Sequence, residues 1–301
     1  MKVAVCQIVI KDDLNFNFNQ MKKFILNASA KEADLVVFPE SCLTGYLGIS
    51  LSSLESLDLD LIHIYLNELS AMAKSQHIAI VTGQYLKRCG NWYNNVIFIG
   101  KDGLCKNSYD KCHLIDKDCY YVKPGEPPEV FNVENVNFML GVCHDIRYAE
   151  HAMWGAIQGA QVYINPFYGF RVPEASKKTQ EIYNSMLATR AVENGLYILG
   201  PNAANNEQMV RSQIRNPQGY AEIMSDTVDE DLLICDINPE LAGHGWIKRR
   251  RSDLYTFQKT SNCRQSFFDK GYWQKEGYMI NHDNNLLNYE CVKMYDDCEK
   301  H

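Results

Sequence analysis

An apolar stretch of the chain ends abruptly at a cysteine. Residues 138–142 read Phe-Met-Leu-Gly-Val, a run rich in strand-forming side chains, and Cys143 follows at once. From Ala149 to Gly159 the spacing of small and apolar residues predicts a helix that a glycine closes. At a turn from strand to helix, backbone N–H groups and the helix dipole favour a thiolate or an oxyanion. We therefore interpret Cys143 as a candidate nucleophile.

Two further stretches place an ionisable side chain directly after an apolar run. Glu40 follows residues 37–39, and Lys111 follows a predicted hairpin. Because ligands gather at strand ends in open α/β sheets, we expect both groups to converge with Cys143. A carboxylate in a semi-apolar pocket has a raised pKa and takes the proton of a thiol, while an ammonium stabilises an oxyanion. The three together predict catalysis through a cysteinyl thioester, with release of an amine or ammonia.

The segments around these residues alternate between strand and helix patterns. Strands are expected at 3–10, 34–40, 78–85, 94–100, 104–109, 138–143, 161–165, 196–200, 219–224 and 231–236, and helices at 16–30, 61–75, 149–159 and 177–194. Asp102-Gly103 predicts a tight hairpin turn, and the last two strands are expected to pair with each other. The pattern indicates an α/β protein whose mixed sheets are covered by helices.

The composition excludes several classes of protein. A net charge of −7 over 301 residues argues against nucleic-acid binding, which needs a basic field. No apolar run approaches the length of a membrane span, and the first expected strand begins at Val3, which leaves no room for a signal sequence. Eleven cysteines include no Cys-x-x-Cys pair or familiar zinc spacing. We therefore expect a reduced, cytoplasmic protein without a membrane or nucleic-acid partner and without a structural metal.

Three blocks of the sequence resemble, in order and spacing, the signature blocks of the nitrilase superfamily of carbon–nitrogen hydrolases. They are Val-Phe-Pro-Glu-Ser-Cys-Leu-Thr-Gly-Tyr at 37–46, Tyr-Asp-Lys-Cys-His-Leu at 109–114, and Gly-Val-Cys-His-Asp-Ile-Arg-Tyr-Ala-Glu at 141–150. The resemblance extends over roughly residues 1–256. It implies a four-layer αββα sandwich that pairs through its helices into homodimers or larger assemblies. It also implies catalysis that needs no metal or organic cofactor.

The resemblance assigns a role to each member of the triple. Glu40 would be the general base and acid, Lys111 the oxyanion stabiliser and Cys143 the nucleophile, and the backbone N–H of His144 would help to hold the oxyanion. Further residues would border the pocket and are candidates for substrate contact, with packing in the wall as the alternative. These are Tyr46, Asn165, Phe167 and Tyr168.

Two departures from the family pattern bear on the site. Many members carry a second active-site glutamate before the Pro-Gly pair at 124–125, where this chain has Asp118, one methylene shorter. Either Asp118 fills that role or a neighbour such as Glu126 does. True nitrilases usually have Trp-Glu after the cysteine, whereas this chain has His-Asp, as several amidase branches do. The sequence therefore favours an amide over a nitrile as substrate.

We expect residues 1–256 to form a carbon–nitrogen hydrolase domain that cleaves a small linear amide. N-carbamoyl compounds are an alternative substrate class, and an acyl or amide-nitrogen transferase is an alternative reaction. A non-catalytic scaffold is the least favoured hypothesis, because a scaffold has no need of all three reactive side chains. Residues 257–301 differ in composition and are expected to be an extension that packs on the domain or on a partner subunit.

Overall fold

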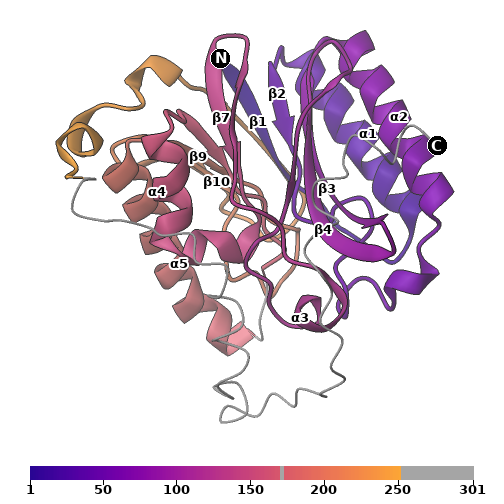
Figure 1. Cartoon of the computed structure of the whole chain (residues 1–301). Coiled ribbons are helices and arrows are strands. Elements are labelled where there is room, and N and C mark those ends of the chain that lie inside the picture. Colours follow the sequence, from indigo (N-terminus) through magenta and orange to yellow (C-terminus); the bar gives the residue numbers. More distant parts are fainter. Residues whose placement is uncertain (170–172, 252–301) are drawn as a thin grey trace. The chain divides into compact units, whose positions relative to one another are not determined.

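Two mixed β-sheets form the centre of the fold, and helices cover their outer faces (Figure 1). The structure, a computed structural model, describes residues 1–169 and 173–251, with residues 173–177 described for their backbone alone. Residues 1–250 belong to one compact unit. The predicted extension at 257–301 and the predicted boundary at 256 lie outside the described residues.

The first sheet has the strand order β12-β1-β2-β3-β4-β5. Its parallel centre is β1 (Lys2–Gln7), β2 (Leu35–Val37) and β3 (Ala79–Arg88), and antiparallel pairings add β4 (Asn91–Ile99), β5 (Cys105–Asp110) and β12 (Asp231–Asp236). The crossovers between the parallel strands are α1 (Leu14–Ala30) and α2 (Leu59–Gln76). Asp13 and Asp58 cap these helices by accepting a hydrogen bond from the N–H three residues on.

The second sheet repeats this pattern with the order β11-β10-β9-β8-β7-β6. Its parallel centre is β7 (Val136–Leu140), β8 (Val162–Ile164) and β9 (Tyr197–Gly200), and antiparallel pairings add β6 (Val130–Val133), β10 (Gln213–Arg215) and β11 (Ala221–Met224). The crossovers contain α4 (Ala149–Ile157) and α5 (Pro173–Asn194). The other helices among the described residues are short: α3 (Asp118–Tyr121), η1 (Leu54–Ser56), η2 (Cys143–Arg147), η3 (Pro239–Leu241) and η4 (Gly245–Arg249).

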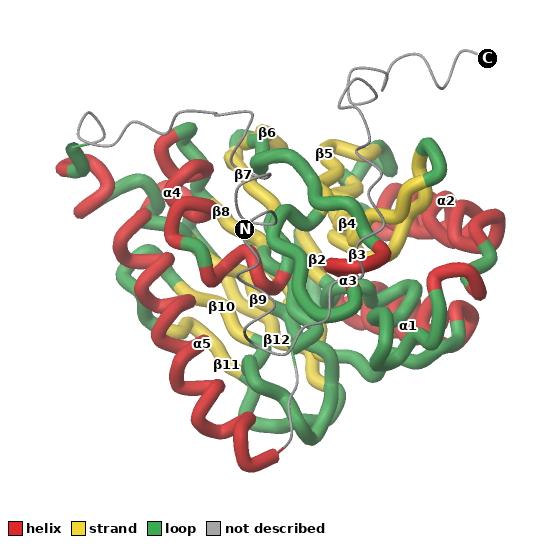
Figure 2. Tube along the Cα trace, turned by 60° about the horizontal axis from the view of Figure 1, so that its bottom comes forward, coloured by secondary structure: helices red, strands yellow, loops and turns green. Residues whose placement is uncertain are grey.

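The two sheets pack face to face and form the main core. Alternate residues of β1 point to opposite sides: Val3 and Val5 join side chains of β7, β8 and β9, whereas Ala4 and Cys6 pack with α1 and α2. Phe98 of β4 meets Phe138 of β7 across this interface, with 5.1 Å between ring centroids. Figure 2 shows the helix pairs on opposite sides of the strands. The arrangement is the predicted four-layer αββα sandwich.

Two sequence expectations about the strands are wrong. The segments 219–224 and 231–236 do not pair with each other, because β11 lies at the edge of the second sheet and β12 pairs with β1 in the first. Alternating apolar residues indicate burial of one strand face but not the sheet that a strand joins. The strand expected to reach Cys143 ends at Leu140, because the chain turns at Gly141 into η2.

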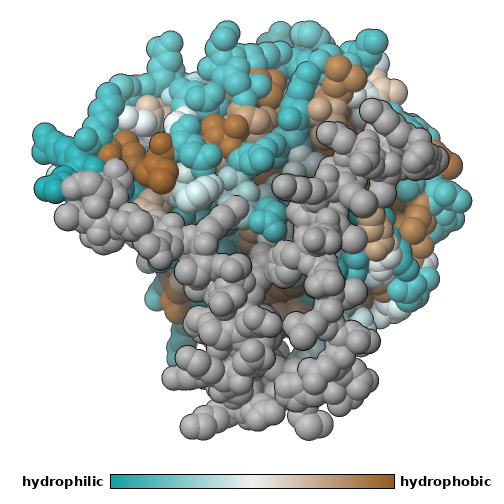
Figure 3. All heavy atoms as spheres, in the orientation of Figure 1, coloured by the Kyte–Doolittle hydropathy of each residue, from teal (hydrophilic) through white to brown (hydrophobic). Residues whose placement is uncertain are grey.

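The described surface is mostly hydrophilic, with scattered hydrophobic side chains, on the face drawn in Figure 3. None of the described helices combines the length and apolar character that crossing a membrane requires.

The contact between the sheets gives a first test of the fold. Phe98→Ala removes a buried ring that touches both Phe131 and Phe138, so we expect it to lower the free energy of unfolding by about 3–5 kcal/mol. Leu104→Ala is the matched control, because Leu104 is 62% exposed in the turn between β4 and β5 and its truncation should cost at most about 0.5 kcal/mol. Urea unfolding followed by circular dichroism measures both. Equal losses would contradict the packing described here.

Candidate active site

Glu40 lies just past the end of β2, at the seam between the two halves of the fold. Its backbone N–H donates to the carbonyl of Phe167 (3.2 Å), which belongs to the segment after β8. Its side chain is buried, and each carboxylate oxygen is occupied: Oε1 accepts from Lys111 Nζ (2.7 Å) and Asn94 Nδ2 (2.8 Å), and Oε2 accepts from the N–H of Tyr168 (2.9 Å). The carboxylate is therefore held in one orientation from both sheets.

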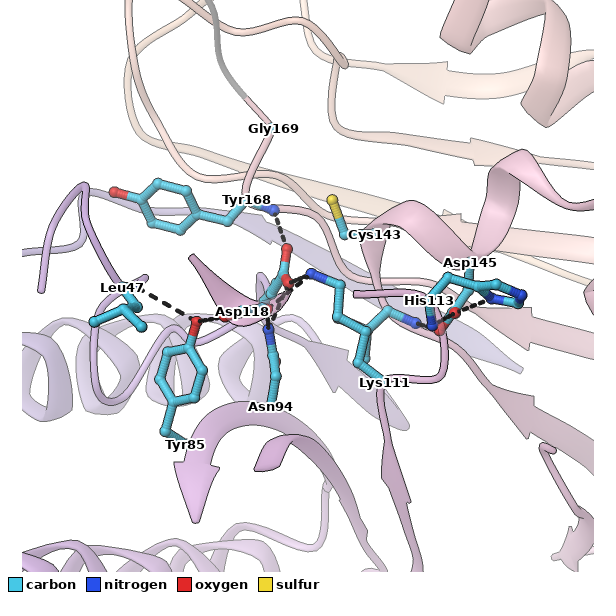
Figure 4. Close-up of polar contacts among 12 residues, drawn as sticks. Leu47, Tyr85, Asn94, Lys111, His113, Asp118, Cys143, Asp145, Tyr168 and Gly169 are labelled. Atoms are coloured by element: carbon cyan, nitrogen blue, oxygen red, sulfur yellow. Dashed lines mark hydrogen bonds and ion pairs between the residues drawn. The ribbon is translucent and has the colours of Figure 1, made fainter. Parts of the chain in front are cut away.

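Lys111 follows β5, and its ammonium is fully buried. Its N–H donates to the carbonyl of Asn94 (2.8 Å), and its own carbonyl accepts from Gly125 (3.0 Å). Besides Glu40, Nζ contacts Asp118 Oδ2 at 3.3 Å. A buried ammonium needs such counter-charges, because it has lost its hydration. Figure 4 shows Lys111 reaching toward Asp118 and Asn94 on one side of the site.

Asp118 is the residue that completes this charge cluster. It is the first residue of α3, is fully buried, and accepts from Asn94 Nδ2 (2.9 Å) and from the hydroxyl of Tyr85 (2.6 Å). Glu126, the alternative for this position, is exposed. Of the two candidates, the structure brings Asp118 to the lysine.

Cys143 begins η2 in a left-handed backbone conformation, with a φ of 46°. A residue other than glycine adopts such a φ only when its surroundings hold it there. The holding contacts come from the segment after β8: the N–H of Cys143 donates to the carbonyl of Pro166 (2.8 Å), and Asn165 Nδ2 donates to the carbonyl of Cys143 (3.3 Å). Cys143 is 5% exposed and lies close enough to Glu40 for the carboxylate charge to raise the pKa of its thiol, after the larger effect of burial.

Burial and charge shift the pKa of all three groups in directions that suit covalent catalysis. Burial raises the pKa of Glu40 above its ordinary value of 4.5, although Lys111 opposes this. Burial alone would lower the pKa of Lys111, but the two carboxylates outweigh it and raise that pKa well above its ordinary value. Burial, and then Glu40, raise the pKa of the Cys143 thiol, against the effect of Lys111. These shifts favour the thiol form of Cys143 and the ammonium form of Lys111.

The residues predicted to contact substrate occupy different surroundings. The ring of Tyr46 stacks on that of Tyr168, with 5.3 Å between centroids, and Lys111 Nζ lies 5.3 Å from the Tyr46 centroid, so both tyrosines adjoin the site. The side chain of Phe167 instead packs in the main core against Tyr183. His144 is half-buried and contacts the ring of Tyr148, and burial lowers its pKa to about 4. Asn165 is buried beneath Cys143.

Three residues at the site were missed in the sequence. Asn94 bridges the carboxylates of Glu40 and Asp118, and Tyr85 contacts Asp118. Asp145 accepts from the N–H of Val142 (2.9 Å), and from both the N–H (2.9 Å) and Nδ1 (2.7 Å) of His113. An available signal was the pair of polar residues Asn94-Asn95 inside a strand, where a polar side chain must find partners to be buried.

Comparison with known proteins shows the family to which the chain belongs. The sequence profile of the carbon-nitrogen hydrolases matches residues 2–244. The chain belongs to the carbon–nitrogen hydrolase family. The resemblance to the nitrilase superfamily is thereby confirmed, and the protein is a hydrolase of this family by descent.

Several relatives of this carbon–nitrogen hydrolase are amidases. An omega-amidase of Xenopus laevis is 25% identical over 283 aligned positions, which cover 87% of this chain and 99% of that protein. A hydrolase of Pseudomonas protegens, encoded in the pqqF 5′ region, is 29% identical over 271 positions, 85% of this chain and 90% of that protein. An amidase from Nesterenkonia sp. AN1, solved with acrylamide added to its active-site cysteine, is 22% identical with a TM-score of 0.73, and the match covers 84% and 98% of the two chains.

The Asn94 amide, which bridges Glu40 and Asp118, can be tested by substitution. In Asn94→Ala, Glu40 and Asp118 lose their shared donor, so we expect the free energy of unfolding to fall by about 1–3 kcal/mol. The pKa of Glu40 should rise further, because the hydrogen bond from Asn94 lowers it. Asn91→Ala is the control on the same strand: its amide donates only to the exposed carbonyl of Cys89 and should matter by at most about 0.5 kcal/mol. Thermal unfolding compares the variants, and equal losses would contradict the bridge.

Proposed function

We propose that the protein hydrolyses the C–N bond of a small linear amide through a thioester on Cys143. The observation that carries the proposal is the contact of the Glu40 carboxylate with the buried Lys111 ammonium (2.7 Å), beside Cys143, whose thiol pKa the same carboxylate raises. A base, a fixed positive charge and a nucleophile within one enclosed site are the groups that acyl transfer needs. The names of the omega-amidase relatives support an amide as the substrate class.

The enclosure of the site favours a small substrate. Glu40, Lys111 and Cys143 are all buried, and the stacked rings of Tyr46 and Tyr168 adjoin them. An extended chain such as a protein would not reach the sulfur without opening this wall. We propose that the tyrosine rings pack against the acyl part of the substrate.

In the first half-reaction, Cys143 Sγ attacks the amide carbon while its proton passes to Glu40. The C–S bond forms, and the carbonyl oxygen becomes an oxyanion that the Lys111 ammonium stabilises, with the N–H of His144 as the proposed second donor. Glu40 then returns the proton to the leaving nitrogen, the C–N bond breaks, and ammonia or an amine departs. The acyl group remains on the sulfur as a thioester.

In the second half-reaction, water attacks the thioester. Glu40 takes the proton of the water, and the same ammonium stabilises the second oxyanion. When the C–S bond breaks, Glu40 gives the proton to the sulfur and the acid leaves. Asp118 and Asn94 take no part in bond making: we propose that Asp118 keeps Lys111 charged and that Asn94 holds the two carboxylates apart.

The proposed nucleophile can be tested by substitution. Cys143→Ala should abolish hydrolysis while the protein stays folded, and Glu40→Gln and Lys111→Ala should each lower the rate by about 10²-fold or more. Released ammonia, measured over a panel of small amides, N-carbamoyl compounds and nitriles, reports activity, and intact-mass analysis detects the acyl adduct.

The control for this experiment is Cys119→Ala, an exposed cysteine next to Asp118. It should leave both the adduct and the rate unchanged. Full activity in Cys143→Ala would refute the mechanism. An adduct that an added amine clears, with no hydrolysis, would instead indicate the transferase.

The pH dependence of the reaction is a second test. Glu40 must be a carboxylate to accept the thiol proton, and burial raises its pKa above 4.5, so kcat/KM should fall with acidification at a pH above 4.5. The raised pKa of Lys111 means that deprotonation of this lysine should cause no loss below pH 10.5. Circular dichroism at each pH separates the acid loss from unfolding. A rate that stays constant down to pH 4.5 in folded protein would contradict the role of Glu40.

A further inference from the structure

A continuous chain of hydrogen bonds runs through the core behind the Cys143 turn. It joins Asp145 Oδ2 to Tyr109 Oη (2.8 Å), Tyr109 Oη to His151 Nε2 (2.9 Å), His151 Nδ1 to Tyr163 Oη (3.0 Å), Tyr163 Oη to Asn165 Oδ1 (2.7 Å), and Asn165 Nδ2 to the carbonyl of Cys143 (3.3 Å). We call these residues, from Asp145 to Asn165, the buried relay. Its members come from η2, β5, α4, β8 and the segment that follows β8.

The relay has little room for alternative arrangements. All of its side chains are buried. Gly141 stands beside it, and a Cβ there would lie 2.4 Å from Tyr163 Oη and 2.8 Å from Asn165 Oδ1, so a glycine is required for this approach. No water is needed to complete the relay, because each polar atom already faces a partner.

With Asp145 ionised and His151 neutral, the relay has one hydrogen fewer than its hydrogen-bond contacts need. An ionised Asp145 only accepts, so the hydrogen of Tyr109 points to it. The oxygen of Asn165 only accepts, so the hydrogen of Tyr163 points to that oxygen. Turning the Asn165 amide over would place its oxygen against the carbonyl of Cys143, so the amide orientation is fixed.

Both phenol oxygens therefore face the ring of His151 as acceptors. A neutral imidazole carries one hydrogen and can satisfy only one of them. All contacts are satisfied when His151 carries a hydrogen on each nitrogen. The contacts are also satisfied when Asp145 is protonated and donates to Tyr109, whose hydrogen then points to His151. The surroundings of Asp145 oppose this arrangement: burial raises its pKa, but His151, His113 and the N–H of Val142 outweigh burial and lower the pKa to about 2. Both arrangements contain one proton more than an ionised aspartate and a neutral histidine supply.

We propose that Asp145 and His151 hold one proton between them at the pH of turnover, and that this proton completes the relay that positions Cys143 for reaction. The positioning role rests on the proposed function, whereas the proton count does not. The apparent pKa values of two groups that interact so strongly describe the pair and are not assigned to either residue alone. Neither residue touches the substrate in this scheme, so both are positioning residues.

The groups around His151 shift its pKa in opposite directions. Burial lowers the pKa of His151 to about 4, because the imidazolium loses its hydration, and the Asp145 carboxylate, 3.8 Å away, opposes this. His113, whose ring centroid is 6.0 Å away, favours the neutral ring. Both phenol oxygens lie within hydrogen-bond distance of the ring nitrogens, 2.9 Å for Tyr109 and 3.0 Å for Tyr163, and they favour the protonated ring when their own hydrogens point to Asp145 and Asn165. Tyr109 also accepts from the N–H of Cys112 (3.3 Å), but that bond supplies no hydrogen to the contact with His151. A bare ring nitrogen that faces an acceptor oxygen in a buried place is costly.

Loss of the shared proton would disturb the position of Cys143 through its hydrogen bond with Asn165. Two acceptors would then face each other inside the relay, and one of its contacts would have to open. The relay ends on the carbonyl of Cys143, which the same Asn165 holds in the left-handed conformation. The sulfur would therefore be less well directed at the substrate, and the loss would fall on reactivity rather than on substrate binding.

The proton count is tested by nuclear magnetic resonance on the intact wild-type protein at neutral pH. The ring nitrogens of His151 are identified by their absence in His151→Gln, and the carboxyl carbon of Asp145 by its absence in Asp145→Asn. We expect either two protonated ring nitrogens on His151 or a protonated Asp145. One bare nitrogen on His151 together with an ionised Asp145 would overturn the proposal. In Tyr163→Phe one acceptor is gone, so His151 should become neutral.

The positioning role is tested by the rate at which iodoacetamide alkylates Cys143, and by kcat on any amide that is turned over. Peptide mass analysis resolves Cys143 from the other free thiols. We expect Tyr163→Phe and Tyr109→Phe to slow alkylation about tenfold, the rate equivalent of one lost hydrogen bond, with KM unchanged. The control is Tyr197→Phe, a buried tyrosine of β9 whose hydroxyl accepts from Asn238, outside the relay.

The outcomes separate this inference from the proposed function. If both relay variants fold and react as fast as Tyr197→Phe, the relay does not position Cys143. If no amide is hydrolysed by the wild type while the proton count and the alkylation rates are as expected, the proposed function fails and the relay stands.

Discussion

The rest of the site depends on one buried positive charge, the ammonium of Lys111. A charge without hydration is tolerated only when opposite charges replace the water, and here Glu40 and Asp118 do so. Their pairing also explains why two carboxylates can be buried so close together, since the ammonium and the amide of Asn94 lie between them. Removal of Lys111 would leave two buried carboxylates without a counter-charge. The geometry that serves catalysis is therefore also the geometry that makes burial of these groups possible.

The proposed nucleophile, Cys143, comes from the other half of the fold. Glu40, Lys111 and Asp118 follow strands of the first sheet or lie in its loops, whereas Cys143 follows β7 of the second. The distance between base and sulfur therefore depends on how the sheets meet. Two backbone contacts fix it directly, from Glu40 to the carbonyl of Phe167 and from Tyr168 to the Glu40 carboxylate. On the opposite side, Figure 4 shows His113 and Asp145 together beyond Lys111, which ties the lysine segment to the cysteine turn.

The alternation of strand and helix patterns predicted mixed sheets covered by helices, and the resemblance to the nitrilase superfamily implied the four layers. Glu40, Lys111 and Cys143 were predicted to converge, and the structure places Glu40 and Lys111 in contact. Apolar runs mark the buried strands, and abrupt changes from apolar to reactive side chains mark their ends. The partners of these residues leave no such signal. Asn94 lies 54 positions from Glu40 and 24 from Asp118, so only the folded sheet brings them together. The same limit applies to sheet membership, since β11 and β12 have ordinary strand patterns but join different sheets. Asn165 was expected near the substrate because it follows a strand, but its side chain contacts the backbone of Cys143.

The charge balance of the site opposes ionisation of Cys143, the proposed nucleophile. One ammonium stands against two carboxylates, so a thiolate would add a third negative charge in a buried place, and the pKa of Cys143 is raised accordingly. In the proposed reaction the proton would therefore leave as the C–S bond forms, when the negative charge moves from sulfur to the carbonyl oxygen. Lys111 cannot accept that proton, because its pKa is raised and it stays an ammonium. The charge of Glu40 reaches the Cys143 thiol and burial raises the pKa of Glu40, so in the proposed reaction Glu40 is the group that receives the proton and returns it.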